Sequence, residues 1–343
     1  MRRRAIAYAL LSAALFGAST PLAKIFVGSI SPLALAGLLY LGSGIGLGAW
    51  LLWRRPVAGL ALRDAPWLAG AIIAGGIVGP ALLMYGLART DAASASLLLN
   101  LEAVLTAALA WVVFRENVDR RIFAGMAAIV AGGALLSWQQ VPNLRALTGP
   151  LLIAAACLAW ALDNNFTRRV SGGDAVVLAA LKGLVAGATN LALALAFGAR
   201  LPAPGALAAT GLVGLFGYGV SLVLFIMALR DLGTARTGAY FSIAPFFGAA
   251  LALLLLGERP EPAFWLAAAL MALGVWLHVT ERHEHEHAHE PTLHTHEHVH
   301  DLHHKHEHAG GWDGHEPHTH QHEHARLRHR HPHYPDLHHR HGH

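Results

Sequence analysis

The chain has 343 residues, of which 55% are hydrophobic and only 13% are Asp, Glu, Lys or Arg. Its mean hydropathy is +0.44, and its formal net charge is +4 with histidine counted as neutral. This balance excludes a water-soluble globular domain and is typical of proteins that cross a membrane many times. We expect the lipid bilayer as its environment and no nucleic-acid partner.

Ten apolar runs recur between Ala5 and Thr280, each of about twenty residues, the length that spans the hydrocarbon core. The predicted spans are 5–27, 32–53, 66–88, 92–114, 121–138, 149–167, 174–197, 206–229, 234–256 and 262–280. The first run follows "MRRR", but it is too long for a signal peptide and carries Lys24 near its end. The sequence therefore predicts an all-α polytopic membrane protein with an uncleaved first helix.

Arginines in the short loops predict the orientation of these spans. If the N-terminus is cytoplasmic, fourteen arginines fall in inside segments, and four fall in outside loops, namely Arg89, Arg145, Arg200 and Arg259. An even number of spans then returns the C-terminus to the cytoplasm. We expect a multi-pass protein of the cell inner (cytoplasmic) membrane with both termini in the cytoplasm.

An internal duplication divides the apolar part of the chain. A shift of 142 residues aligns "NLEAVLTAALAWVVFRENVDRRIF" with "SIAPFFGAALALLLLGERPEPAFW" and places Glu116 on Glu258. Because each copy has five spans, the second copy must cross the membrane in the opposite sense, which is an inverted repeat typical of secondary transporters. The predicted domains are two five-helix repeats, 1–140 and 148–281, and a histidine-rich tail, 282–343.

Three motifs within these spans resemble a known family. They are "LFGASTPLAK" in the first span, "SASLLLNLEAVLTAALAWVVFRE" across the fourth and "SIAPFFGAALALLLLGE" across the ninth. On these residues the chain is similar to EamA-type members of the drug/metabolite transporter superfamily. The resemblance implies ten helices, cytoplasmic termini, alternating access and a cavity lined by the first four helices of each half. It also implies that the fifth helix of each half packs apart from this cavity, toward a second subunit in a homodimer.

The chain departs from the family pattern in both copies. Where relatives often have Glu-Pro in the fourth span, this sequence has Glu102-Ala103, whereas the ninth span keeps its proline as Ala244-Pro245 without the acid. The asymmetry leaves one midplane carboxylate in the pair of repeats.

Glu102 is the first candidate for a substrate or coupling-ion site. An ionised carboxylate at mid-membrane costs roughly 2 to 3 kcal/mol unless it is paired or faces water. We expect Glu102 to bind a proton, a metal cation or the amino group of a substrate; the alternative is a neutral acid hydrogen-bonded between helices. Thr106 shares its helical face, and Asn100 is a second neighbour.

Polar residues near the cytoplasmic side of the sixth and seventh spans are further candidates. Lys182 either snorkels to the interface or pairs with Glu102 or an anionic substrate, which would disfavour a metal cation. Asp163, Asn164 and Asn165 form a cluster in which Asp163 either pairs with a nearby arginine or belongs to a cytoplasmic gate.

Prolines mark positions where a span can kink or break. Ser19, Thr20 and Pro21 combine two hydroxyls with a proline that frees a backbone carbonyl in the first span. Pro80 and Pro245 have the same potential in the third and ninth spans. Broken helices expose the polar backbone that transporters use at their sites.

The tail contains 24 of the 25 histidines, all within residues 283–343. Their H-x-H spacing is typical of binding to zinc, nickel, cobalt or copper, and interleaved Glu, Asp, Arg, Leu and Pro distinguish it from a purification tag. We expect a disordered tail that holds several exchangeable ions; a passive metal buffer and a pH-sensitive cationic tail are the alternatives. The candidate ligands are His283, His285, His287, His289, His294, His296, His298, His300, His318, His320, His322 and His324.

Three functions remain open at this point. The favoured one is a secondary active transporter, in the export direction, for a small molecule, with a metal-binding cytoplasmic tail and no required cofactor. The alternatives are a Ni, Co or Zn efflux carrier whose tail collects the ion, and a non-transporting metal store or sensor. Metal cargo is disfavoured because the first nine spans contain no histidine and one cysteine, Cys157. No enzyme is expected, since neither a nucleotide-binding glycine loop nor a Ser/His/Asp arrangement occurs outside the tail.

Overall fold

A computed structural model describes residues 2–53, 64–114, 120–138, 147–170, 174–232, 234–280, 284–289, 292–298, 318–324 and 327–332. The chain divides into two compact units, Met1–Thr280 and Glu281–His343. Among the described residues, the first unit is built from helices, and strands are confined to the second.

The first half of the helical unit ends with α7. Its elements are α1 (Arg2–Phe26), α2 (Pro32–Trp53), α3 (Ala65–Ala71), η2 (Ile72–Val78), α4 (Gly79–Leu87), α5 (Ala92–Leu98), α6 (Leu101–Phe114) and α7 (Arg120–Trp138). The π-helical turn η2 joins α3 to α4 without a gap. Asp91 begins α5, because its carboxylate accepts a hydrogen bond from the backbone N–H of Ser94 at 2.7 Å and so caps the helix.

The second half contains the same kinds of element. They are α8 (Thr148–Val170), α9 (Ala175–Ala196), α10 (Pro204–Gly214), η4 (Leu215–Val220), α11 (Ser221–Leu232), α12 (Thr234–Phe241), α13 (Ala244–Leu255) and α14 (Pro262–Val279). Here η4 is a second π-helical turn, and it joins α10 to α11. Asp174 caps α9 by accepting a hydrogen bond from the Val176 N–H at 2.9 Å.

Eight helices within the described residues are long and apolar enough to cross a membrane, as expected for a polytopic membrane protein. The sequence predicts ten spans, and the difference lies at 149–167 and 234–256. The first of these corresponds to α8, whose C-terminal half is made less apolar by Asp163, Asn164 and Asn165. The second is divided into α12 and α13, each shorter than a full span.

Helices α2 and α9 cross where glycines face each other. A Cβ atom at Gly183 of α9 would lie 2.7 Å from the backbone nitrogen of Gly44 in α2. A Cβ atom at Gly187 would lie 2.5 Å from the backbone nitrogen of Leu41. Only residues without a side chain let two helices approach this closely. The crossing therefore holds the first half of the unit directly against the second.

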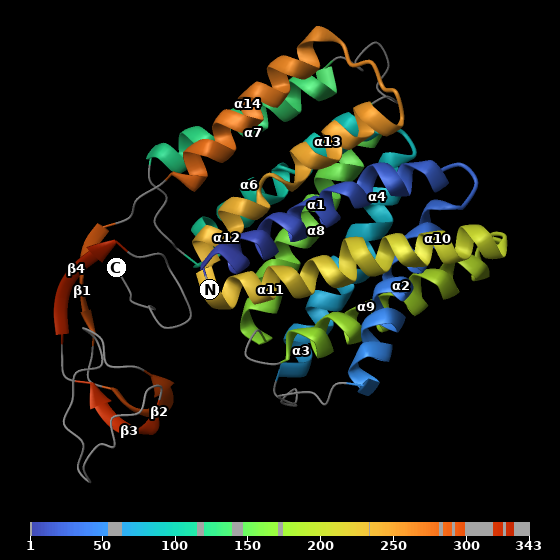
Figure 1. The fold of residues 1–343 in the computed structure, drawn as a ribbon. Coiled ribbons are helices and arrows are strands. Elements are labelled where there is room, and N and C mark those ends of the chain that lie inside the picture. The colour runs from blue at the N-terminus through green and yellow to red at the C-terminus, as the bar shows by residue number, and fades with distance from the viewer. Residues whose placement is uncertain are drawn as a thin grey trace. The chain divides into compact units, whose positions relative to one another are not determined.

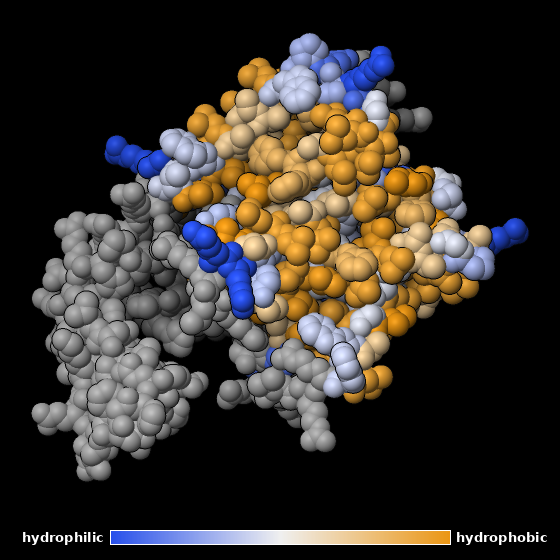
Figure 2. Space-filling model, in the orientation of Figure 1, coloured by the Kyte–Doolittle hydropathy of each residue, from blue (hydrophilic) through white to orange (hydrophobic). Residues whose placement is uncertain are grey.

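The remaining helices complete the bundle. Helix α1 packs against α10, η4, α11 and α13, and α8 packs against α3, η2, α4 and α6. Helices α7 and α14 pack against each other and lie side by side at one edge of the helical unit (Figure 1). Hydrophobic residues dominate the face of this unit drawn in Figure 2. Such a surface needs lipid around it.

The described parts of the tail differ from the disordered tail that the sequence predicts. Strand β1 (Glu284–His289) pairs antiparallel with β4 (Leu327–Pro332), and β2 (Thr292–His298) pairs antiparallel with β3 (His318–His324). The physical reason is the H-x-H spacing itself, because a period of two matches a strand, whereas composition alone favours disorder. His283 and His300 lie outside the described residues.

The crossing of α2 and α9 can be tested by replacing Gly183 with a larger residue. Gly183→Val should lower the free energy of unfolding by about 1–3 kcal/mol, because the added carbons would overlap the backbone of α2. Thermal unfolding in detergent measures the effect. Gly211→Ala is the control, because a Cβ atom there meets nothing within 4 Å. Equal unfolding temperatures for the two variants would contradict the close crossing.

Candidate functional site

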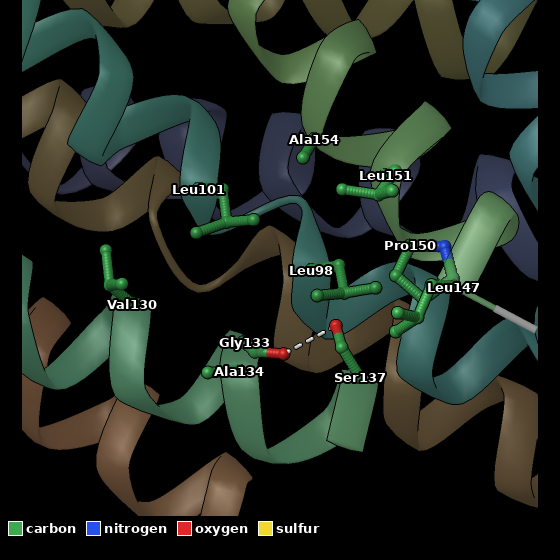
Figure 3. Close-up of a pocket in the computed structure, with 10 residues that line it drawn as sticks. All are labelled: Leu98, Leu101, Val130, Gly133, Ala134, Ser137, Leu147, Pro150, Leu151 and Ala154. Atoms are coloured by element: carbon green, nitrogen blue, oxygen red, sulfur yellow. Dashed lines mark hydrogen bonds between the residues drawn. The ribbon is translucent and has the colours of Figure 1, made fainter. Parts of the chain in front are cut away.

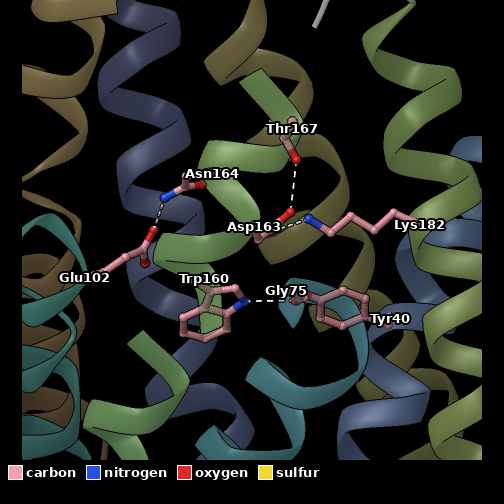
Figure 4. Close-up of polar contacts among 8 residues, drawn as sticks. All are labelled: Tyr40, Gly75, Glu102, Trp160, Asp163, Asn164, Thr167 and Lys182. Atoms are coloured by element: carbon pink, nitrogen blue, oxygen red, sulfur yellow. Dashed lines mark hydrogen bonds and ion pairs between the residues drawn. The ribbon is translucent and has the colours of Figure 1, made fainter. Parts of the chain in front are cut away.

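Glu102 lies directly after an interruption of the fourth predicted span. Helix α5 ends at Leu98 and α6 begins at Leu101, so that Glu102 belongs to the first turn of α6. A carboxylate is favoured there by the positive end of the helix dipole. Its Oε1 atom accepts a hydrogen bond from Asn164 Nδ2 of α8 at 2.9 Å (Figure 4). Two residues predicted as candidates are thus brought together from the two halves of the unit.

The neighbouring residue Asp163 points to a different helix. Its Oδ2 atom forms an ion pair with Lys182 Nζ of α9, and its Oδ1 atom accepts a hydrogen bond from Thr167 Oγ1 at 2.9 Å. The side chains of Lys182 and Asp163 are only 16% and 8% exposed. The sequence predicts that Lys182 either snorkels or pairs with Glu102 or an anionic substrate, and that Asp163 either pairs with a nearby arginine or belongs to a cytoplasmic gate. The structure joins them to each other instead, which neutralises two charges inside the bundle (Figure 4).

Pro80 frees a carbonyl group in η2. In a π-helix each carbonyl oxygen bonds to the N–H five residues later, so Gly75 O would face the nitrogen of Pro80, which carries no hydrogen. Gly75 O instead accepts hydrogen bonds from Tyr40 Oη and Trp160 Nε1, both at 2.9 Å. One backbone oxygen thereby joins α2 and α8 to the third predicted span (Figure 4).

Asn190 of α9 satisfies the next carbonyls of the same turn. Its Nδ2 atom donates to Gly76 O at 3.4 Å and to Ile77 O at 3.2 Å. Its Oδ1 atom is buried without a hydrogen-bond partner in the described part of the chain, and the hydroxyl of Thr106 is buried in the same way. Unpaired buried acceptors are rare in folded proteins. These two atoms are therefore exceptions among the described buried polar groups.

The other predicted candidates donate to backbone oxygens nearby in the chain, and Asn100 Nδ2 also lies 3.9 Å from Met271 Sδ of α14. The amides of Asn100 and Asn165 and the hydroxyl of Ser19 each donate to a backbone oxygen three or four residues earlier, at 2.6 to 2.9 Å. Thr20 is buried, with 1% of its surface exposed. Helix α1 continues through Pro21, so no break is present at this proline. The structure does not join these residues to Glu102 or to Lys182.

A second polar arrangement holds the turn between α4 and α5. Lys24 Nζ donates to the backbone oxygens of Leu87 and Thr90 at 2.6 and 2.7 Å. The carboxylate of Glu258, between α13 and α14, accepts hydrogen bonds from the first two N–H groups of α5, both at 2.8 Å. A cation thus meets the carbonyl end of one helix and an anion meets the N–H end of the next, as the helix dipoles favour. We call Lys24 and Glu258 the α4–α5 clamp.

The clamp and the Asp163 pair lie near opposite ends of α8. Gly149, at the start of α8, abuts Thr90, since a Cβ atom at Gly149 would lie 2.2 Å from Thr90 Oγ1. Asp163 is fourteen residues further along the same helix, a distance of about 21 Å at 1.5 Å per residue. The two polar arrangements are therefore separated by much of the bilayer thickness.

An apolar pocket is lined by residues of α5, α6 and α7 and of the start of α8 (Figure 3). Its lining residues are Leu98, Leu101, Val130, Gly133, Ala134, Ser137, Leu147, Pro150, Leu151 and Ala154. The single polar side chain among them, Ser137, donates its hydroxyl to Gly133 O at 2.8 Å. This pocket consequently offers no side chain to hold a charged or strongly polar cargo.

Several residues of the polar region were not found from the sequence. They are Tyr40, Gly75, Trp160 and Asn190. The duplication could have pointed to two of them. The shift of 142 residues aligns Tyr40 with the candidate Lys182, and it aligns Gly75 with Gly217 of η4. Glu258 is also part of this alignment, but no local sequence pattern links it with α5.

The ion pair of Asp163 and Lys182 can be tested with a double-mutant cycle. Asp163→Asn and Lys182→Met should each lower the free energy of unfolding by about 3–5 kcal/mol, because each leaves one uncompensated buried charge. The double variant should recover most of that loss. Chemical denaturation in detergent measures all four proteins. If the double variant loses as much stability as the two single variants together, the two charges do not interact.

The α4–α5 clamp has a matched control on the same loop. Glu258→Gln should lower the free energy of unfolding by about 0.5–2 kcal/mol, since an amide offers one acceptor where the carboxylate serves two N–H groups. Glu261→Gln should change little, because the Glu261 side chain makes no capping hydrogen bond to α14. Thermal unfolding of the two variants compares them directly. A larger effect at Glu261 would contradict the clamp.

Known proteins share both the sequence pattern and the fold. The EamA-like transporter family matches the chain twice, over residues 3–138 and 147–280. YedA of Escherichia coli strain K12, named an uncharacterized inner membrane transporter, is 26% identical over 282 residues, which cover 77% of this chain and 86% of YedA. A protein of Streptantibioticus cattleyicolor, named a probable terminal-alkyne amino-acid exporter, is 27% identical over 228 residues, covering 65% of this chain and 75% of that protein.

A crystal structure also resembles the helical unit, with a TM-score of 0.60 and 21% sequence identity over 81% of this chain and 98% of the other. This similarity concerns the fold alone. The family match covers both halves and confirms the resemblance predicted from the three motifs. The protein is accordingly a multi-pass membrane transporter and not an enzyme. The chain belongs to the EamA-like transporter family.

Proposed function

We propose that the protein is a secondary active transporter that exports a small organic molecule across the cytoplasmic membrane by alternating access. The observation that carries this proposal is the polar region at the junction of the two halves, where Glu102 meets Asn164 and Asp163 meets Lys182. Ionisable residues inside a membrane are costly and typically mark a substrate or ion pathway. The groups come from α6, α8 and α9, so a relative movement of the halves would change their contacts.

Part of the proposal is a ten-pass arrangement of two inverted repeats, residues 1–140 and 148–281. Each helix has a counterpart about 142 residues away in the other half. When every helix is replaced by its counterpart, the packing of α1 on α11 and α13 becomes the packing of α8 on α4 and α6. The pairs α2–α9 and α7–α14 map onto themselves. The turns η2 and η4 occupy equivalent places in the two copies. This exchange supports a two-fold relation between the halves.

We infer that the cargo enters at the end of the bundle where α8 terminates. Asn164 is exposed near that end, whereas Lys24 and Glu258 hold the helices together near the other. The arginine distribution favours a cytoplasmic location for the end where α8 terminates, with both chain termini and the tail on the same side. Entry from the cytoplasm is the direction that export requires.

Glu102 is the proposed coupling group. Its described hydrogen-bond partner is the neutral amide of Asn164, in contrast to Asp163, which is already paired with a lysine. A carboxylate without a counter-charge can take up a proton or the amino group of a cargo. Protonation would let the empty carrier return without moving a bare charge through the bilayer.

Divalent metal efflux has less support as the transport function. The ion pair with Lys182 occupies Asp163, and the described side chains contain no group of three His, Cys, Asp or Glu residues that could hold an ion together. The relative named as a probable amino-acid exporter adds support for an organic cargo with an amino group.

A transport assay on purified protein tests this proposal. Proteoliposomes preloaded with a panel of radiolabelled amino acids should release at least one of them under an imposed pH gradient. Glu102→Gln should lower that release at least tenfold, because the coupling carboxylate is lost, and Glu261→Gln should leave it unchanged. Release that is as fast with Glu102→Gln as with the intact protein would contradict the role of Glu102.

Metal cargo is tested in parallel by nickel, cobalt and zinc accumulation in cells. We expect no reduction that depends on Glu102. If the intact protein lowers the cellular metal level and Glu102→Gln restores it, the transported cargo is a metal ion and not an organic molecule.

A further inference from the structure

Two consecutive residues of α8 bind charged groups on different helices. Asn164 donates a hydrogen bond to Glu102 of α6 at 2.9 Å, and Asp163 forms an ion pair with Lys182 of α9 (Figure 4). Consecutive residues of an α-helix point about 100° apart, because one turn takes 3.6 residues. Helix α8 therefore has the carboxylate of Glu102 on one side and the ammonium group of Lys182 on another.

The two sides differ in their access to a cargo. Asn164 is exposed and Glu102 is partly exposed, whereas Asp163 is buried. The side chain of Lys182 is only 16% exposed, and that of Asp163 is 8% exposed. A cargo that enters the polar region can therefore reach Glu102 more readily than it can reach the ion pair.

Asp163 is held in place by more than its lysine. Its Oδ1 atom accepts a hydrogen bond at 2.9 Å from Oγ1 of Thr167, one turn further along α8. Its carboxylate also packs against Gly75 of η2, where an added Cβ atom would overlap it. Only a residue without a side chain fits there. The carboxylate is thus fixed beside Lys182, and the lysine keeps its counter-charge.

The charges of these three side chains do not balance. Glu102 and Asp163 are carboxylates and Lys182 is an ammonium group, so their formal charge is −1 when all three are ionised. The α4–α5 clamp lies toward the opposite end of α8. A charge inside the bilayer is costly unless it is matched. A bound cation would match it, whereas a zwitterion would leave the total charge unchanged.

We propose that Asp163 determines cargo selectivity by occupying Lys182, so that the site accepts an organic cation and disfavours a zwitterionic amino acid. This inference rests on the proposed function, in which Glu102 binds the amino group of the cargo. The carboxylate of a zwitterion needs a cationic partner once it leaves water, and Lys182 is already paired. An amine without a carboxylate has no such requirement. Asp163 is a positioning residue, because it acts on the cargo through Lys182.

The preferred cargo is then a primary amine that carries no carboxylate. A basic amino acid is an intermediate case, since its second amino group gives it a net positive charge but its carboxylate still lacks a partner. A neutral amino acid is the least favoured of the three. The order follows from the charges of Glu102, Asp163 and Lys182 and does not depend on the shape of the cargo.

Compounds that differ only in a carboxylate test this proposal. The pairs are 2-phenylethylamine with phenylalanine and tyramine with tyrosine. Equilibrium binding of the radiolabelled compounds to the full-length protein in detergent is measured at neutral pH by scintillation proximity. The proteins compared are the intact chain, Asp163→Asn, Asp163→Asn/Lys182→Met and Glu261→Gln. The last is the matched control, because it neutralises a carboxylate that precedes α14, outside the polar region.

We expect the intact protein to bind each amine about tenfold more tightly than the matching amino acid, because an unpaired carboxylate is costly to bury. Asp163→Asn should remove this preference, since Lys182 becomes available to the carboxylate of the amino acid. Asp163→Asn/Lys182→Met should restore it, since the lysine is gone. Glu261→Gln should keep the ratio of the intact protein. A merely structural role of Asp163 would weaken both compounds of a pair alike and would leave their ratio unchanged.

Equal binding of amine and amino acid by the intact protein would overturn the selectivity proposal. This comparison needs no variant, so it decides the matter even if Asp163→Asn does not fold. The proposed export function would stand in that case, provided that Glu102→Gln still stops transport. A ratio that is unchanged in Asp163→Asn, or not restored by adding Lys182→Met, would overturn the proposal as well. Failure of the intact protein to bind either compound of both pairs would contradict the amine cargo itself.

Discussion

A bilayer supplies no water to complete hydrogen bonds, so polar groups within the helical unit depend on partners in the chain. The third predicted span shows the consequence. Pro80 removes a donor, and the carbonyl oxygens of η2 then require partners from elsewhere. Tyr40, Trp160 and Asn190 provide them from α2, α8 and α9. The carbonyl oxygens of this span are thereby hydrogen-bonded to three other helices.

The same constraint places the charged groups. Asp163 and Lys182 are neutralised as a pair, and their helices are the ones that also bind η2. Glu102 stands apart because its described partner is an amide, which leaves its charge available for chemistry. The region therefore contains one pair that stabilises the junction of the halves and one carboxylate that can change its protonation or its partner. A transporter that alternates between two conformations needs both properties.

The tail follows a different pattern, because its described strands are rich in histidine and contain few apolar residues. Its histidines follow a strict alternation, which gives a strand one uniform face. The membrane unit and the tail thus differ in sequence pattern, since long apolar runs form the first and alternating histidines form the second.

Composition and hydropathy by themselves determined the membrane class, and local motifs identified the family, because both depend on residues that are close in the sequence. Glu102 and Asp163 could be identified as costly charges, but their partners could not. Asn164 follows Asp163 directly in the chain, yet it binds Glu102, which is 62 residues away. The role of Glu258 at α5 joins residues 165 or more positions apart. Only the tertiary structure decided these pairings, because helix packing, and not local sequence, sets which polar groups share a site.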